Sequence, residues 1–440
     1  MTSSTSLSLP KGPSLFYLLN LASLDRPSFL TELSLDYGEV ARLPSLVRTY
    51  LINNPDYLQD ILLKNHENYV KGGLALKPLS KALGQGILMI KGKTWQNRRR
   101  LFAPHFQPSQ TESFTKIIVE ATEKTIRTWR TNQTFDICHE MMKIVLSIAL
   151  KTFFSTELSA EKMGRMIKKI GCENKYACST LALLPWLPSI GNLRLQFAKR
   201  YLQKEIRSII HDHQKNLHTY DDLLSHIIKQ TDTLNLTPQD IFDEAKTFLL
   251  TGHETTGTAL GWTWYLLGNH PDIYQKVLDE TDAKLNGHSL EKNQWQDLTY
   301  TKMVFEETLR LFPPIWITGR KVTETMTLGS YQISAGSDIL ICPYTLHRQP
   351  QYWENPERFI PERFESEQHK NRHRFSYLPF GAGPRICIAS HFAMQMALTI
   401  IATICQHCKI ETIHEQNIQY DHLISLKPQN GILVKIKRFY

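Results

Sequence analysis

The stretch from Pro238 to Gly268 predicts one long helix, and this constrains the fold more than any other part of the chain. Apolar residues recur through it at intervals of three and four, and the sequence GNHP at 268–271 is a strong signal for its end. The apolar runs FLL before its centre and ALGWTWYLL after it indicate that the helix is buried.

The centre of this helix, LLTGHETTGTALGW, breaks the apolar pattern. Gly252, Gly257 and Gly261 each cost about 0.5–1 kcal/mol relative to alanine in a helix interior. Polar residues also occupy 251 and 253–256, and such a violation is typical of a functional site. A solvated surface helix with a kink is the alternative, but the apolar flanks favour the buried, functional interpretation. We expect a kink at 252–256 that opens space beside the polar residues.

Helical periodicity dominates the rest of the chain, so the predicted fold class is mainly α with a small β portion. Further helices are expected near 55–65, 93–103, 112–130, 139–153, 194–216, 272–285 and 299–311, and another just after Cys387. Strand-like alternation is confined to 39–44, 48–53, 326–340 and 431–437. No linker of Gly/Ser-rich or Pro-rich composition interrupts the sequence, so we expect a single domain over 1–440.

Composition sets limits on location and partners. The 440 residues carry 42% hydrophobic side chains and a formal charge of +9, without the zinc-finger or RNP-type motifs of nucleic-acid binding. The positive charge is compatible with an acidic protein partner. The apolar run near the N-terminus covers about ten residues and lacks a basic region before it, so we expect no transmembrane anchor and a cytoplasmic location. The seven cysteines are odd in number and scattered, which favours reduced thiols.

One of these cysteines, Cys387, lies in the segment LPFGAGPRICIAS at 378–390. Gly381 and Gly383 give the backbone before it the freedom to turn and to approach another group closely. The alternative is a buried, inert thiol. Cys405 and Cys408 have C-x-x-C spacing, but no second pair accompanies them and both are expected inside an apolar helix, so packing is favoured over metal binding.

Three weaker patterns accompany this segment. Glu307 and Arg310 lie at i and i+3 on one predicted helix face and can pair. Arg363, in the Pro-Glu-Arg-Phe segment 361–364, can join them. Trp95 and Arg99, four residues apart on another helix face, present two donors that suit an anionic group.

Taken together, these residues resemble the haem-thiolate monooxygenases of the cytochrome P-450 family. The cysteine signature is met by Phe380, Gly383, Arg385 and Cys387, and four further patterns match in order: Trp95/Arg99, Glu254/Thr255, Glu307/Arg310 and 361–364. The resemblance covers the chain from about residue 8 to the C-terminus. It implies a helix-rich triangular prism with haem b between the long central helix and the helix that follows Cys387.

The resemblance also implies a role for each matched residue. Cys387 is the expected thiolate ligand of the iron, and Glu254 and Thr255 the catalytic pair that delivers protons. The remaining haem contacts implied are Trp95, Arg99, Arg320, Phe380, Gly381, Arg385 and Ala389. Glu307, Arg310 and Arg363 are implied to form a structural ion network.

Two positions depart from the family pattern. Ala389 stands where glycine is usual, and Thr251 stands where alanine or glycine is usual. The Thr251 hydroxyl can either donate to the carbonyl four residues earlier or face the oxygen pocket, and the sequence does not decide between these alternatives.

The implied activity is insertion of one oxygen atom from O2 into a hydrophobic substrate, by hydroxylation or epoxidation. A long-chain fatty acid is favoured, with a terpenoid or steroid next, because the segments expected to line the pocket are largely apolar: 68–90, 176–192, 244–255, 313–319 and 423–431. The alternatives are an H2O2-dependent peroxygenase of the same fold and a non-catalytic haem-thiolate sensor. A polar helix centre at Glu254 and Thr255 disfavours both.

The electron donor is expected to be a separate protein, because no flavin or iron–sulfur segment follows the haem region before Tyr440. A ferredoxin or flavodoxin with an NAD(P)H-dependent reductase is implied, acting on a monomer without nucleic-acid partners. The basic cluster at 369–375, with Arg98 and Arg100, is the predicted docking surface, and an ordinary solvated charge run is the alternative.

Overall fold

The computed structural model describes residues 8–14, 26–45, 47–177, 189–365, 367, 371–413, 416, 418–422 and 424–439. Helices make up most of this chain and the strands are short, as the sequence predicts. Two compact units are present, one formed by Met1–Lys77 with Leu309–Cys387 and the other by Pro78–Thr308 with Ile388–Tyr440. Each unit is therefore assembled from two distant stretches of chain.

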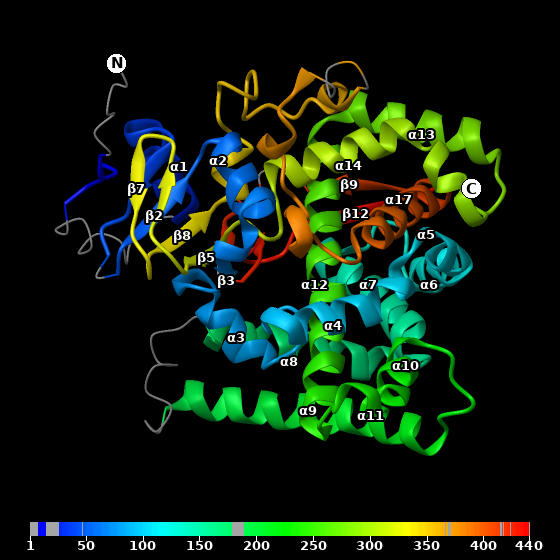
Figure 1. Cartoon of the computed structure of the whole chain (residues 1–440). Coiled ribbons are helices and arrows are strands. Elements are labelled where there is room, and N and C mark those ends of the chain that lie inside the picture. Colours follow the sequence, from blue (N-terminus) through cyan, green and yellow to red (C-terminus); the bar gives the residue numbers. More distant parts are fainter. Residues whose placement is uncertain are drawn as a thin grey trace. The chain divides into compact units, whose positions relative to one another are not determined.

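The first unit is built on a five-stranded sheet with the order β1-β2-β8-β5-β3 (Figure 1). Strands β2 (Thr49–Ile52) and β8 (Asp338–Ile341) pair in parallel and are buried at every position. This burial on both faces is typical of parallel strands, and it explains why their apolar runs do not alternate cleanly. The other strands are β1 (Val40–Arg42), β3 (Tyr69–Lys71) and β5 (Thr318–Val322), with β6 (Met326–Leu328) and β7 (Tyr331–Ile333) forming a separate hairpin.

One apolar core joins this sheet to the segment that leads to Cys387. Ile52 and Ile341 from the sheet share it with Leu62, Phe375 and Leu378. The helices and turns of the unit are α1 (Arg26–Tyr37), α2 (Pro55–Gln59), η2 (Asp60–Lys64), η3 (His66–Asn68), η4 (Leu74–Leu76), α15 (Pro343–Leu346), η9 (Pro361–Phe364), η10 (Arg374–Ser376) and η11 (Gly383–Arg385). The core therefore holds the start of the cysteine loop, the segment 378–387 that ends at Cys387.

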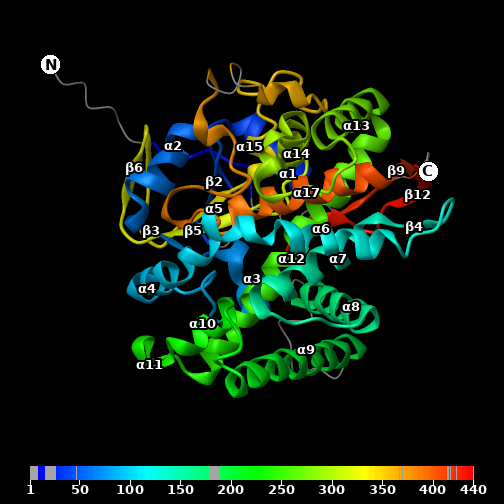
Figure 2. The same cartoon turned by 90° about the vertical axis from the view of Figure 1, so that its right-hand side faces the viewer.

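The second unit is mainly helical and surrounds α12 (Pro238–Asn269), which has 32 residues. Thr237 and Asp240 form a capping box at its start, Pro238 occupies the first turn, and Pro271 begins the next helix. Helix α7 (Ile137–Phe154) packs along α12, and α8 (Ala160–Ala177) packs side by side with α9 (Ile190–Lys215) (Figure 2).

The remaining elements of this unit complete its core and its edges. The helices and turns are α4 (Gly92–Phe102), η5 (Ala103–Phe106), α5 (Pro108–Thr111), η6 (Glu112–Phe114), α6 (Thr115–Ile126), α10 (Leu223–Lys229), α11 (Thr231–Leu234), α13 (Pro271–Leu285), η8 (Lys292–Asp297) and α17 (Ser390–His407). The strands are β4 (Thr134–Asp136), β9 (Cys408–Thr412), β10 (Tyr420–His422), β11 (Leu426–Pro428) and β12 (Leu433–Arg438). Helices α3 (Lys77–Leu83) and α14 (Thr299–Leu311) each carry a boundary between the units.

The glycines of α12 have a different structural role from the one that the sequence suggested. The helix is α-helical throughout, so the expected opening at 252–256 does not interrupt it. A Cβ at Gly261 would lie 2.5 Å from Cys138 Sγ, and one at Gly257 would lie 3.0 Å from Met142 Cγ. Both neighbours belong to α7. The glycines therefore allow α7 and α12 to approach closely, and this approach offsets their cost in helix propensity.

This role predicts opposite outcomes for two alanine substitutions. Gly261→Ala should lower the thermal midpoint, because overpacking a core costs about 1–3 kcal/mol and exceeds the helix-propensity gain. Gly164→Ala in α8 is the matched control, because an added Cβ there meets nothing within 4 Å, and it should raise the midpoint. Adding Cys138→Ala should restore much of the stability lost in Gly261→Ala. A Gly261→Ala protein as stable as Gly164→Ala would contradict the packing role.

Candidate functional site

The loop before Cys387 is shaped by two glycines in the first unit. Gly381 has φ +72° and Gly383 has φ +67°, a conformation that other residues rarely adopt. An added Cβ at Gly383 would also overlap the carbonyl oxygen of Leu62 in η2. The Cys387 amide donates to the Phe380 carbonyl at 2.9 Å, which closes the loop. The loop therefore holds Cys387 in a defined backbone position.

The Cys387 side chain is exposed, which rules out the buried, inert thiol. Among the described cysteines, Cys138, Cys342, Cys405 and Cys408 are buried and Cys172 is intermediate. Burial raises the pKa of the Cys342 thiol to about 11 and that of Cys408 to about 12, so these groups stay protonated. Cys408 is the first residue of β9, not part of a helix as expected, but its burial agrees with a packing role.

The loop residues expected to contact haem are partly accessible. Phe380, Arg385 and Ala389 are all half-buried, and Gly381 is exposed. Arg385 ends the turn η11, and Ala389 directly precedes α17. The helix predicted just after Cys387 is therefore confirmed, beginning at Ser390.

Arg320, on β5 of the same unit, is a buried cation. Its Nη1 donates to the Gly319 carbonyl at 2.9 Å, and no carboxylate of the described residues lies within ion-pair distance of it. Burial alone lowers the pKa of this guanidinium to about 10. A buried positive charge in this setting suits an anionic group such as a carboxylate of a bound ligand.

Arg310 holds the polypeptide upstream of the cysteine loop. Its guanidinium is fully buried and donates to the carbonyls of His347, Pro356 and Arg358 at 2.9, 2.6 and 3.0 Å. It also lies over the Trp353 ring, 5.1 Å from its centroid. These bonds fix a long irregular segment that has few backbone partners of its own.

The two other members of the expected ion network are buried as well. Arg363 donates to the Asn355 carbonyl at 2.8 Å, and so binds the same irregular segment as Arg310. Glu307 is fully buried three residues before Arg310 on α14. The structure thus places both arginines in a scaffold around 355–358.

His347 connects this scaffold to the cysteine loop, and sequence reasoning did not identify it. Its Nδ1 lies 3.2 Å from the Arg310 carbonyl oxygen, and its Nε2 accepts from the Leu378 amide at 2.8 Å. An accepting Nε2 means that the ring is neutral, with the proton on Nδ1. Burial, followed by the positive charge of Arg310, lowers the pKa of His347 to about 3.

A neutral buried histidine makes stability depend on pH in a defined direction. As pH falls below about 6.5, the unfolded chain binds a proton at position 347 and the folded chain does not, so the folded state loses up to about 1.4 kcal/mol per pH unit. His347→Gln should therefore show a flatter loss of unfolding free energy between pH 6.5 and 5 than the unsubstituted protein. His288→Gln, at an exposed histidine, is the control and should leave the slope unchanged. Equal slopes in all three proteins would contradict a neutral His347.

The polar centre of α12 lies in the second unit, and Glu254 is its buried acid. Its carboxylate accepts from Asn174 Nδ2 of α8 and from Ser425 Oγ at 2.9 Å, and it lies 3.4 Å from Lys427 Nζ. Asn174, Ser425 and Lys427 were not singled out from the sequence. No pattern near Glu254 could have found them, because they come from chain segments 80 to 173 residues away.

The threonines on this helix bond to their own backbone. Thr251 Oγ donates to the Thr247 carbonyl at 2.6 Å, which decides between the two places left open for its hydroxyl. Thr255 Oγ donates to the Thr251 carbonyl at 2.8 Å. The hydroxyl hydrogen of Thr255 is thus occupied, and its lone pairs remain able to accept a hydrogen bond.

Helix α4 carries the expected donor pair and corrects one expectation. Trp95 and Arg99 are both half-buried, one turn apart on α4.

Arg98 is buried, with Nη atoms 2.5 Å from Asp240 and 2.7 Å from Glu244. Burial raises the pKa of Glu244 to about 7 despite this arginine. Arg98 therefore cannot serve in an exposed docking surface, and its ion pairs join α4 to α12.

The comparisons with known proteins give the family. The profile of the family described as Cytochrome P450 matches residues 8–436. A cyclooctatin synthase of Streptomyces melanosporofaciens is 32% identical over 89% of this chain and 85% of its own length. A cyclooctat-9-en-7-ol 5-monooxygenase of the same organism is 30% identical over 86% of this chain and 83% of its own length. Cytochrome P450 4V2 of Homo sapiens is 29% identical over 86% of this chain and 78% of its own.

This chain belongs to the cytochrome P450 family. It is a haem-thiolate monooxygenase with haem b as its cofactor, and the mainly-α fold with small sheets agrees with the family. Activity in this family requires a redox partner, O2 and a hydrophobic substrate. The exposed thiol of Cys387 and the buried cation of Arg320 fit the iron and the carboxylates of haem. None of the described helices has the length and apolar character needed to cross a bilayer.

Proposed function

We propose that this monooxygenase hydroxylates or epoxidises a hydrophobic substrate, with Cys387 as the iron ligand and with Glu254 and Thr255 delivering protons. The observation that carries the proposal is the Cys387 loop. Its thiol is the exposed one among the described cysteines, and two positive-φ glycines precede it, of which Gly383 occupies the glycine position of the family signature.

Bound haem supplies the activation of O2, and thiolate ligation favours cleavage of the O–O bond. Within the first unit, Arg320 and Arg385 would bind haem carboxylates, and Phe380 and Gly381 would form part of the loop that contacts the haem. Within the second unit, Trp95 and Arg99 donate to the same kind of group, and Ala389 contributes the start of the helix after the cysteine. Glu307, Arg310 and Arg363 support the loop and do no chemistry.

The ligand assignment has a direct spectroscopic test. The reduced CO complex should show the long-wavelength Soret band of thiolate ligation, and Cys387→Ala or Cys387→His should abolish it. Cys172→Ala, at a partly buried cysteine, is the control and should keep the band. A band that survives in both Cys387 variants would show that another residue holds the iron.

Glu254 and Thr255 have complementary roles in proton delivery. Glu254 is a buried carboxylate, held in place by Asn174, Ser425 and Lys427. Thr255 directs its own hydrogen to the Thr251 carbonyl, so its oxygen accepts a hydrogen bond from a proton carrier. The threonine therefore orients the carrier, while the glutamate exchanges the proton.

Removal of this hydroxyl should uncouple the enzyme. We expect Thr255→Ala to bind haem, CO and substrate normally and to consume NADPH, while product per NADPH drops severalfold and hydrogen peroxide rises. Positioned proton transfer is worth about 10²- to 10⁴-fold, so partial loss is measurable. Thr263→Val is the matched control, because Thr263 bonds to the Ala259 carbonyl in the same way on the same helix. A lowered thermal midpoint with unchanged coupling in Thr255→Ala would leave only a structural role.

For the substrate, the names of the relatives favour a terpenoid or steroid, the second expected class, over a long-chain fatty acid. One Streptomyces relative is a 5-monooxygenase of cyclooctat-9-en-7-ol, whose name denotes a cyclic, unsaturated alcohol. We therefore place a terpenoid-like cyclic alcohol ahead of a long-chain fatty acid or a steroid. Of the apolar segments expected to line the pocket, 178–188 lies outside the described residues. A ligand screen for the haem spin-state shift, with cyclic alcohols and fatty acids as separate arms, distinguishes the classes.

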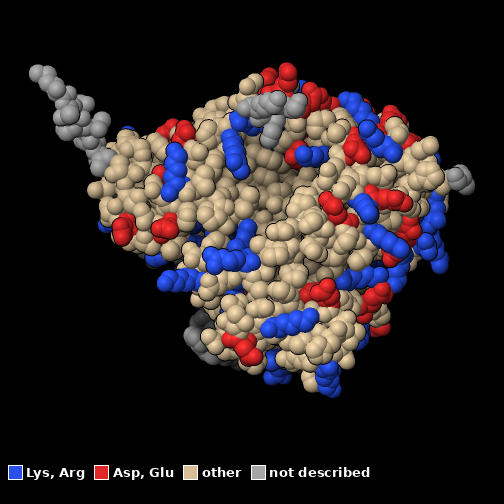
Figure 3. Space-filling model, turned by 45° about the vertical axis from the view of Figure 1, so that its right-hand side comes forward, with Lys and Arg blue, Asp and Glu red and all other residues tan. Residues whose placement is uncertain are grey.

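The electron donor that we propose is an acidic ferredoxin or flavodoxin reduced by an NAD(P)H-dependent reductase. Basic and acidic side chains are interspersed over the face shown in Figure 3, so the formal charge of +9 does not form one large basic patch there. Part of the predicted docking cluster, 368–370, lies outside the described residues. Arg372 packs over Trp353 at 4.0 Å and donates to the Arg363 carbonyl, so it belongs to the scaffold. Arg100 and Arg374 remain exposed.

Charge reversal at these two arginines tests the docking proposal. Arg100→Glu and Arg374→Glu should slow reduction by the partner and weaken its dependence on salt, because attraction between charged surfaces speeds association. Arg130→Glu changes the net charge equally at another exposed site and serves as the control. Equal rates in all three variants would show that neither arginine contacts the partner.

We also propose a monomer in the cytoplasm. The six described cysteines are all free of disulfides, which supports a reducing compartment.

A further inference from the structure

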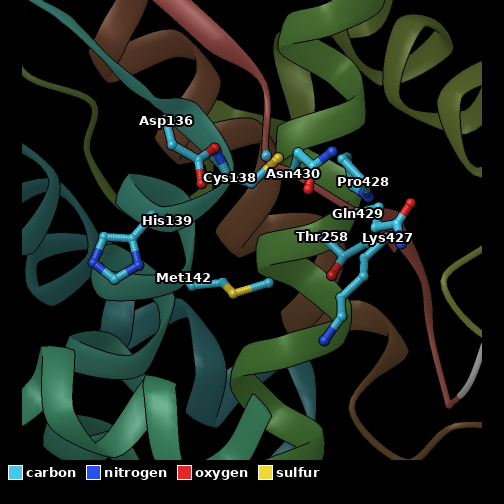
Figure 4. Close-up of a pocket in the computed structure, with 10 residues that line it drawn as sticks. Asp136, Cys138, His139, Met142, Thr258, Lys427, Pro428, Gln429 and Asn430 are labelled. Atoms are coloured by element: carbon cyan, nitrogen blue, oxygen red, sulfur yellow. The ribbon is translucent and has the colours of Figure 1, made fainter. Parts of the chain in front are cut away.

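A pocket of about 400 Å³ in the second unit is not used by any role assigned above. It lies beside α7 and α12, at the turn between β11 and β12 (Figure 4). Its lining mixes polar and apolar side chains: Asp136, Cys138, His139, Met142, Thr258, Lys427, Pro428, Gln429, Asn430 and Gly431.

Lys427 connects this pocket to Glu254. Figure 4 shows its side chain extending along α12 past Thr258. The ammonium lies 3.4 Å from Glu254 Oε1, with the lysine side chain 23% exposed and the glutamate side chain 9% exposed. The buried carboxylate is thus joined to a more open space through Lys427.

Thr258 indicates that the pocket holds water. It lies one helical turn after Glu254 and is fully buried, and its hydroxyl has no hydrogen-bond partner within the described part of the chain. A buried hydroxyl without a partner is unfavourable, and an ordered water commonly satisfies such a group. The pocket has room for several waters, since each occupies about 30 Å³ in the liquid. Asp136, Gln429 and Asn430 provide further polar contacts for them.

We propose that this pocket is a water-filled entry through which protons from solvent reach Glu254, with Lys427 as the positioning residue that holds the carboxylate at its edge. The inference rests on the proposed role of Glu254 in proton delivery. A hydronium ion relayed through the pocket waters gives its proton to Glu254 Oε1 and becomes water. The neutral carboxyl then passes the proton towards Thr255 and returns to a carboxylate.

Lys427 itself is not the proton donor. Its ammonium lies within ion-pair distance of Glu254 Oε1 and acts on the carboxylate by attraction. Its replacement should disturb where the carboxylate points without removing a proton source.

The experiment has a structural arm and a kinetic arm, both on the haem-loaded protein. A high-resolution crystal structure should show ordered waters within hydrogen-bond distance of Thr258 Oγ and Lys427 Nζ. A dry pocket would overturn the proposal whatever the activity. In turnover, Lys427→Met and Thr258→Val should each lower product per NADPH by about tenfold, a fraction of the 10²- to 10⁴-fold that positioned proton transfer contributes.

The kinetic arm also measures the solvent deuterium isotope effect on product formation. This effect should increase in both variants, whereas a merely structural disturbance would leave it unchanged. Lys435→Met, at an exposed lysine of β12, is the control and should match the unsubstituted enzyme. Two variants are used so that a folding defect in one leaves the other informative.

Failure of this inference is distinguishable from failure of the proposed function. If Glu254→Gln and Thr255→Ala uncouple turnover while Lys427→Met and Thr258→Val do not, protons reach Glu254 by another route and the pocket role is wrong. If Glu254→Gln leaves coupling unchanged, the proton-delivery role is wrong and the pocket role falls with it.

Discussion

A buried guanidinium, that of Arg310, organises the first unit. Burying a charge is costly unless it is fully hydrogen-bonded, and here three backbone carbonyls and the face of Trp353 satisfy it. The same carbonyls belong to an irregular segment that would otherwise lack partners. The ring of His347 then connects the Arg310 carbonyl to the Leu378 amide, at the start of the cysteine loop. The backbone position of Cys387 therefore depends on contacts that begin at Arg310.

In the second unit, the corresponding constraint is the close approach of α7 and α12. Gly257 and Gly261 remove the Cβ atoms that would meet Met142 and Cys138, so the two helices share a tight contact. The polar residues of α12 lie next to this contact in the sequence. A helix anchored so firmly by packing can retain an acid and several threonines in its interior, because the surrounding core offsets their unfavourable burial.

The sequence predicted the helices and strands better than the contacts that their residues make with one another. Helical periodicity located α12 within one residue of its ends, and the capping and stop signals explain why. It did not explain the glycines, because close helix packing depends on a second helix about 115 residues away. Arg98 was misassigned for the same reason. A run of three arginines suggests a charged surface, and only the fold shows that one of them faces two acids of α12. His347 and Lys427 carried no local signal at all.

Consecutive residues of α8 contact α12 at two points, and one of these contacts is to the buried acid Glu254. Glu173 pairs with Lys246 at 2.8 Å, and Asn174 donates to Glu254. Lys246 and Glu254 are eight residues apart, about two turns, so both contacts fall on one side of α12. A displacement of α8 along α12 would break a buried ion pair and a hydrogen bond to a buried carboxylate at once, and each loss leaves a polar group unpaired. The surroundings of Glu254 are therefore set by α8 as well as by Ser425 and by Lys427 of β11.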